Sequence, residues 1–307
     1  MDILIFIVSM SALIYGADFI IEESEKIAIH FKISAFVIGA TLVALGTSLP
    51  EMAVSMSASM QGSGDIAVAN VIGSTIFNIS LVLGVVFLIA KNINPERDLF
   101  AKDSAWSLFP ILIFILMSID GKLGKLDGIL FLILMGAYLL FLIQSDQVEE
   151  TFEESLEDKK HFPWAKTIGL LIIGFIFVVG GANFAIESAG NIARDFGISE
   201  WIIGLFLVAF GTSLPELTVA IKAARSNNAD MAIGAIIGSN VANFTMVLGL
   251  SSIINPLNVD LSANFFDIMA ALIVSVMLVF ITANKLYNKS AGIVMMTVLA
   301  LVISNSF

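Results

Sequence analysis

The sequence has no cysteine, two histidines and little charge. The absence of cysteine excludes disulfides, thiolate metal sites and cysteine nucleophiles. His30 and His161 both lie outside the apolar runs, which argues against imidazole chemistry inside them. Charged residues make up 13% of the 307 residues, about half of the roughly 25% found in soluble domains. This composition excludes a water-soluble enzyme, and the net charge of -11 argues against nucleic acid as a partner.

Long apolar segments dominate instead, and the mean hydropathy is +0.97. A helix needs about 20 mostly apolar residues to cross a bilayer. The first such segment begins at Asp2 with no basic stretch before it, so we expect no cleaved signal peptide. We therefore predict an all-α polytopic membrane protein with ten transmembrane helices, at 2–21, 34–59, 66–90, 104–119, 126–143, 165–187, 199–222, 231–255, 264–283 and 289–305.

The distribution of basic residues predicts the orientation of these helices. If the N-terminus is outside, twelve of the fifteen Lys and Arg residues are cytoplasmic, and only Lys122, Lys125 and Arg194 are external. Basic residues concentrate on the cytoplasmic side of membrane proteins. We therefore expect a multi-pass plasma-membrane protein with both termini extracellular. The acidic stretch 144–164 is then a cytoplasmic loop, which we interpret as a solvated linker, with a regulatory cation site as the alternative.

The two halves of the chain match each other at an offset of 165 residues. Segment 36–55 is identical to segment 201–220 at 12 of 20 positions, including Gly-Thr-Ser-Leu-Pro-Glu in both. The same offset pairs 70–84 with 235–249. Five helices per repeat is an odd number, so the second repeat must enter the membrane from the opposite side. This inverted arrangement is typical of secondary transporters, whose substrate site lies at the repeat interface. We therefore divide the chain into three parts: a first five-helix repeat at 1–143 (motif 36–84), the loop at 144–164, and a second, inverted five-helix repeat at 165–307 (motif 201–249).

Glu51 and Glu216 lie deep inside the second and seventh predicted spans. A carboxylate at that depth costs at least about 2.5–3.5 kcal/mol and marks a functional site unless it is paired. No Lys, Arg or His occurs at comparable depth. The two glutamates must therefore be protonated, face water or bind cations. The alternative is a protonated pair that serves packing alone.

Pro50 and Pro215 directly precede these glutamates. Proline lacks an N–H and clashes with the carbonyl four residues earlier, here that of Gly46 or Gly211. We expect each helix to break near mid-membrane, where irregular backbone is tolerated only beside a cavity or within protein. The break would free carbonyl oxygens beside the hydroxyls of Thr47, Ser48, Thr212 and Ser213. A kink that only relieves packing is the alternative.

The third and eighth spans carry polar pairs spaced four apart, Ser74 with Asn78 and Ser239 with Asn243. Such residues form one polar stripe on a helix, although Ser and Asn in membranes also serve as packing contacts between helices. The donor atoms are then all oxygen, which favours Ca²⁺, Na⁺ or Mg²⁺ over Zn²⁺ or Cu⁺. One Ca²⁺ neutralises two carboxylates, and two or three Na⁺ can occupy the same site. A site that either ion satisfies suits obligatory exchange, which would be electrogenic if three Na⁺ replace one Ca²⁺.

The paired GTSLPE segments, each followed by a GS-x-x-x-N helix, resemble the Ca²⁺/cation antiporter superfamily, and within it the prokaryotic sodium/calcium exchangers. The resemblance covers nearly the whole chain. It implies exchange of Na⁺ for Ca²⁺ by alternating access, with the first and sixth helices sliding over a rigid core. Na⁺ and Ca²⁺ would be transported ions, with no cofactor and no obligate protein partner beyond the lipid bilayer. It also implies Glu51 and Glu216 as central ligands, joined by Thr47, Ser48, Ser74, Asn78, Thr212, Ser213, Ser239, Asn243 and the backbone carbonyls of Ala44, Thr47, Ala209 and Thr212.

Asn243 departs from this resemblance, because many sodium-dependent members carry aspartate there. The change removes a titratable group, makes the site more symmetric, and argues against K⁺ cotransport. It also counts slightly against Na⁺ as the counter-ion, so a H⁺/Ca²⁺ exchanger is the alternative transporter. An intramembrane hydrolase using Ser48 or Ser213 would need a general base that the spans do not supply. A channel would be distinguished by flux without a counter-ion.

Overall fold

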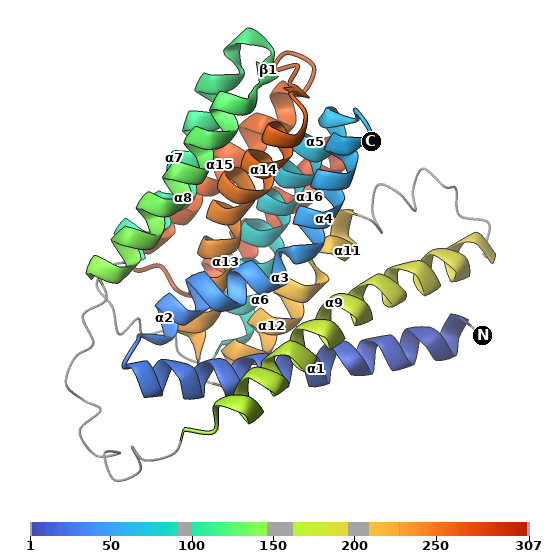
Figure 1. Ribbon diagram of the computed structural model, residues 1–307, viewed down its shortest axis with the longest axis vertical. Helices are drawn as coiled ribbons and strands as arrows, with labels where there is room; N and C mark the ends of the chain where they lie inside the picture. The colour runs from blue at the N-terminus through green and yellow to red at the C-terminus, as the bar shows by residue number, and fades with distance from the viewer. Residues whose placement is uncertain (1, 91–99, 146–161, 196–208, 227, 306–307) are drawn as a thin grey trace.

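A computed structural model describes residues 2–90, 100–145, 162–195, 209–226 and 228–305 (Figure 1). These residues are almost entirely helical, because apolar segments in lipid satisfy their backbone hydrogen bonds only as helices or closed barrels. The α-helices are α1 (Asp2–Phe31), α2 (Ala35–Ile38), α3 (Ala44–Thr47), α4 (Leu49–Met60), α5 (Gly64–Phe77), α6 (Gly84–Ile89), α7 (Phe100–Met117), α8 (Lys125–Ser145), α9 (Trp164–Asp195), α11 (Ala209–Thr212), α12 (Leu214–Arg225), α13 (Ala229–Ala242), α14 (Leu248–Ile254), α15 (Phe265–Ala283) and α16 (Lys289–Asn305).

Seven of the described helical runs are long and apolar enough to cross a membrane, and the bent pair 35–60 brings the number to eight. Helix α16 is also apolar but has only 17 residues. The chain is therefore a multi-pass membrane protein. Part of the predicted span at 199–222 and most of the predicted loop at 144–164 lie outside the described residues. The total of ten spans stays a prediction.

Two predicted helix ends are wrong. Helix α1 continues past residue 21 to Phe31, and α9 continues past residue 187 to Asp195. The cluster of charged residues that starts at Glu22 favours an end at residue 21. Within the extension, Glu23 and Lys26 form an ion pair of 2.6 Å one turn apart, which adds a small stabilisation. Ser24 and Ala28 on the same turns are buried against the rest of the protein.

Helices α1 and α9 lie side by side and cross one end of the remaining bundle obliquely (Figure 1). They pack on each other more extensively than either packs on the bundle. Glycine permits this approach, since a Cβ added at Gly16 would lie 2.8 Å from the Gly174 carbonyl oxygen. The pair therefore forms a layer of its own, and α1 also contacts α12 of the bundle.

Helix α13 belongs to the run Ala229–Ile254, which is the most buried candidate span in the described part of the chain. Small residues bring its backbone against the segment between α2 and α3. A Cβ added at Gly238 would lie 2.3 Å from the Ala40 carbonyl oxygen. At one end of the bundle, the two-residue strands β1 (Lys122–Leu123) and β2 (Leu257–Asn258) pair antiparallel and join the turns that follow α7 and α14.

Candidate functional site

The predicted helix breaks are confirmed in both halves of the chain. Helix α3 ends at Thr47, Ser48 has φ -83° and ψ 7°, and α4 begins at Leu49. Ser213 stands between α11 and α12 in the same way, with φ -91° and ψ 2°. The axis bends by 46° at the first break. Each proline then falls in the first turn of a new helix, where its missing N–H costs nothing.

This geometry places both glutamates in the first turns of the new helices α4 and α12. Their exposed fractions are 0% for Glu51 and 2% for Glu216. The two carboxyl groups are close enough to interact electrostatically, and neither takes part in either of the ion pairs of the described residues. The positive end of a helix macrodipole favours negative charge at this position. The structure therefore brings together two acidic groups that no described basic side chain neutralises.

Two of the predicted polar ligands contact these carboxyl groups, and a third links the two halves of the chain nearby. Ser48 donates a hydrogen bond of 3.1 Å to Glu216 Oε1, from the other half of the chain. Ser74 approaches Glu51 Oε1 at 3.5 Å. Ser239 lies 3.4 Å from the Ala44 carbonyl oxygen, which again links the two halves. All predicted side-chain ligands are buried: Thr47, Ser48, Ser74, Asn78, Thr212, Ser213, Ser239 and Asn243.

The predicted backbone ligands lie at the breaks themselves. Ala44 begins α3 and Ala209 begins α11, while Thr47 and Thr212 end these helices. The Thr47 hydroxyl donates back to the carbonyls of Val43 and Ala44, at 3.1 and 3.2 Å. The Ala44 carbonyl also accepts from Ser48 N at 3.1 Å, so the break does not free it, and the backbone ligands stay a prediction.

Several oxygens of the site have no hydrogen-bond partner among the described residues: Glu51 Oε2, Glu216 Oε2, Asn78 Oδ1, Asn243 Oδ1 and Ser213 Oγ. A buried polar atom left without a partner costs about 1–3 kcal/mol, and more when it is charged. A hard cation would satisfy these acceptors together. Within the described ranges, no site gathers three or more histidine, cysteine or acidic groups. A cation here must therefore be held by hydroxyl, amide and carbonyl oxygens in addition to the glutamates.

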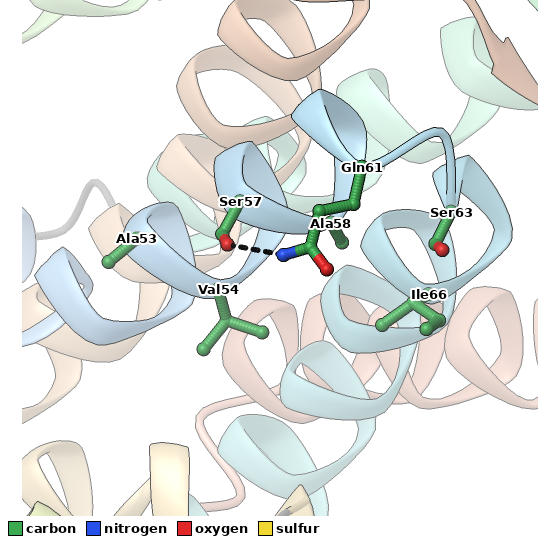
Figure 2. Close-up of a pocket in the computed structure, with 7 residues that line it drawn as sticks. All are labelled: Ala53, Val54, Ser57, Ala58, Gln61, Ser63 and Ile66. Atoms are coloured by element: carbon green, nitrogen blue, oxygen red, sulfur yellow. Dashed lines mark hydrogen bonds between the residues drawn. The ribbon is translucent and has the colours of Figure 1, made fainter.

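A groove of about 420 Å³ runs along α4, starting two residues after Glu51 (Figure 2). Gln61 Nε2 donates a hydrogen bond of 3.0 Å to Ser57 Oγ within it. Ser57 and Ala53 are exposed although they lie on a helix of an otherwise apolar bundle. The lining residues are Ala53, Val54, Ser57, Ala58, Gln61, Ser63 and Ile66.

Sequence reasoning missed the π-helical turns that begin at the site asparagines. One π-helix covers Asn78–Leu83 and another covers Asn243–Val247, while a third covers Gly39–Val43. Such turns are frequent at functional sites. Asn70 was also missed, although it is a polar residue within an apolar span. It donates hydrogen bonds to the Glu51 carbonyl at 3.3 Å and to Ser55 Oγ at 3.0 Å, and so holds the start of α4 in place.

The paired asparagines make the site less symmetric than their residue types suggest. Asn78 Nδ2 donates to Asn240 Oδ1 at 3.3 Å. Neither polar atom of Asn243 has a hydrogen-bond partner in the described part of the chain. The expectation that two asparagines equalise the two halves is therefore met in composition but not in hydrogen bonding.

Comparison with known proteins shows which family the chain belongs to. The model of the family described as sodium/calcium exchanger protein matches residues 1–144 and 166–307. An uncharacterized membrane protein of Methanocaldococcus jannaschii is 38% identical over 284 residues, covering 92% of this chain and 90% of its own. The sodium/calcium exchanger MaX1 of Methanosarcina acetivorans is 31% identical over 337 residues, covering 96% and 95%.

A solved structure is similar over the whole length. The sodium-calcium exchanger NCX_Mj, soaked with zero Na⁺ and Ca²⁺, has a TM-score of 0.86 at 34% identity. The match covers 100% of this chain and 99% of that one. With its broken helices, its buried carboxylates and its match to the family model, the chain belongs to the sodium/calcium exchanger family and is a multi-pass membrane antiporter of Ca²⁺ against another cation.

Proposed function

We propose that the protein exchanges Na⁺ for Ca²⁺ at one site shared by Glu51 and Glu216. The observation that carries this proposal is the convergence of two buried carboxyl groups that lie outside both described ion pairs. The surrounding unpartnered oxygens are hard ligands, which suit Ca²⁺ and Na⁺. The names of the related exchangers support the same pair of ions.

Charge balance explains why exchange is obligatory. Two carboxylates at the middle of a membrane are costly when no cation is bound. The protein therefore switches between its outward-facing and inward-facing conformations only when cations occupy the site. One Ca²⁺ neutralises the pair, and three Na⁺ leave it with a charge of +1. Exchange of three Na⁺ for one Ca²⁺ therefore moves one net positive charge in the direction of Na⁺.

The architecture that we propose has ten transmembrane helices in two inverted five-helix repeats, 1–143 and 165–307, joined by the loop 144–164. The matched breaks at Ser48 and Ser213 support it, as do the matched π-helices at Asn78 and Asn243. The bias of basic residues supports a plasma-membrane orientation with both termini outside and the loop in the cytoplasm.

Alternating access has a structural basis in the layer formed by α1 and α9. Asp18 on α1 forms an ion pair with Lys222 at the end of α12. At the offset of 165, this pair corresponds to Asn183 on α9 and Ser57 on α4, which are both exposed. The α1 layer therefore covers the α12 side of the site, while the groove along α4 stays open (Figure 2). In the proposed orientation, this groove lies on the extracellular side of the site, whose ligands are themselves buried.

Neutralising the ion pair is expected to shift the protein away from this conformation, in which the groove along α4 is exposed. A partly exposed ion pair contributes about 1 kcal/mol, so Asp18→Asn should change the ratio of the two conformations by about fivefold. Because the chain has no cysteine, Ser57→Cys gives a single thiol in the groove. Its labelling by an impermeant maleimide from outside should be slower in the Asp18→Asn background.

Two controls make this measurement specific. Lys166→Met neutralises an exposed lysine on α9 and should leave the labelling rate unchanged. The charge-swapped pair Asp18→Lys with Lys222→Asp should restore the original rate. Equal labelling rates with and without Asp18→Asn would show that the ion pair does not set the conformational balance.

The proposed coupling is tested with proteoliposomes loaded with Na⁺ and diluted into Na⁺-free buffer that contains radiolabelled Ca²⁺ at equal pH on both sides. We expect Ca²⁺ uptake that depends on internal Na⁺, that K⁺ does not change, and that an inside-positive potential accelerates. Uptake driven by a pH gradient without Na⁺ would contradict Na⁺ coupling.

That outcome would instead support the second candidate, a H⁺/Ca²⁺ exchanger. The observation that favours it is Asn243, which removes a carboxylate from the eighth span and leaves only Glu51 and Glu216 as acidic groups at the centre. Protons could then neutralise the pair in place of Na⁺.

A further inference from the structure

Asn240 is a buried polar residue that the predicted ligand set does not include. It follows Ser239 on α13 and has an exposed fraction of 0%. Its Oδ1 accepts the hydrogen bond of 3.3 Å from Asn78 Nδ2, so the contact joins the first half of the chain to the second. Asn78 is itself fully buried, at the start of a π-helix.

In this contact, the donor end of the Asn78 amide faces Asn240. A carboxamide has a donor end and an acceptor end, and only the oxygen attracts a cation. Because Asn240 takes the Nδ2 hydrogen bond, Oδ1 is the atom of Asn78 that is left without a partner among the described residues. The reverse pairing, in which Asn240 Nδ2 donates to Asn78 Oδ1, is also possible, since Asn240 Nδ2 has no other partner among the described residues. A bound cation favours the observed pairing, because the reverse one would turn the Asn78 N–H groups toward the cation.

The other half of the chain lacks this arrangement. At the offset of 165, the counterpart of Asn240 is Thr75, whose hydroxyl donates to the Val71 carbonyl of its own helix at 2.9 Å. Asn243, the counterpart of Asn78, has no hydrogen-bond partner for either polar atom in the described ranges. One asparagine of the pair is therefore hydrogen-bonded across the two halves, and the other has no such contact among the described residues.

We propose that Asn240 is a positioning residue that holds the Asn78 amide oxygen toward the bound cation and so raises the affinity for Ca²⁺. This inference rests on the proposed function, because it takes the shared site to be the Ca²⁺ site. Pre-orientation of a ligand raises affinity by reducing the ordering that binding must supply.

The test is the binding of radiolabelled Ca²⁺ to detergent-purified protein in Na⁺-free buffer. Asn240→Leu removes the acceptor at similar volume, and Asn240→Thr introduces the residue type that the first half uses. Each is expected to raise the half-saturating Ca²⁺ concentration about fivefold, the order expected for one lost hydrogen bond. Asn240→Asp keeps an acceptor for Asn78 and should retain the high affinity. Thr75→Val is the matched control and should bind Ca²⁺ like the unmodified protein.

A double-mutant cycle separates positioning from a general structural role. Asn78→Ala removes the amide that Asn240 orients, so adding Asn240→Leu to it should weaken Ca²⁺ binding no further. Unchanged affinity in both Asn240→Leu and Asn240→Thr, or an effect fully additive to that of Asn78→Ala, would overturn the inference. The binding assay needs no counter-ion, so a failure of Na⁺ coupling in vesicles would overturn the proposed function and leave this measurement intact.

Discussion

Replacing Glu51 or Glu216 by glutamine reduces Ca²⁺ transport at least a hundredfold while the protein still inserts and folds. Each substitution removes one of the two buried carboxyl groups that would face the bound cation. One unit charge about 4 Å from another contributes about 4 kcal/mol at an effective dielectric constant of about 20, which exceeds a factor of one hundred in binding. Glutamine has nearly the same volume and costs less to bury, so stability should be maintained or increased.

This result is measured as initial Ca²⁺ uptake into proteoliposomes, at equal amounts of inserted protein. Glu187→Gln, at an exposed carboxylate on α9, is the matched control and should transport normally. Normal uptake by either Glu51→Gln or Glu216→Gln would show that the pair is not the shared ion site.

Replacing Gly238 by valine is expected to destabilise the fold by about 3 kcal/mol, the upper end of ordinary overpacking. The added Cβ would lie 2.3 Å from the Ala40 carbonyl oxygen and 2.7 Å from its Cα, and backbone atoms cannot rotate away. Transport should fall as well, because the neighbouring Ser239 contacts the Ala44 carbonyl across the same interface.

Thermal unfolding followed by size-exclusion chromatography measures this loss of stability. Gly136→Val on α8 is the control, since a Cβ there meets no described atom within 4 Å. Equal unfolding temperatures for Gly238→Val and Gly136→Val would contradict the close packing of α13 against the segment between α2 and α3.

The sequence was sufficient to predict the helix breaks and the two deep glutamates. Proline has one strong local effect, so Pro50 and Pro215 located both breaks without knowledge of the rest of the fold. The free-energy cost of burying a carboxylate in an apolar span likewise depends on its position in that span, which the sequence shows. The repeat then placed Glu51 and Glu216 at one axis, and the structure has them within electrostatic range of each other.

Features that depend on distant contacts were not predictable in this way. The extension of α1 to Phe31 buries Ser24 and Ala28 against the rest of the protein, and the charged residues from Glu22 onward do not reveal that contact. The π-helices begin at Asn78 and Asn243, but no residue type specifies an extra residue in a turn. Asn240 matters through its contact with Asn78, 162 residues away in the chain.

The most direct test of the shared ion site is an anomalous-scattering map of Ca²⁺ in crystals of the protein soaked without Na⁺. Protein oxygens bind Ca²⁺ at about 2.3–2.6 Å. We expect one dominant peak within that distance of a carboxylate oxygen from Glu51 and of another from Glu216. A saturating soak that places Ca²⁺ away from both carboxylates, or leaves the space between them empty, would contradict the account.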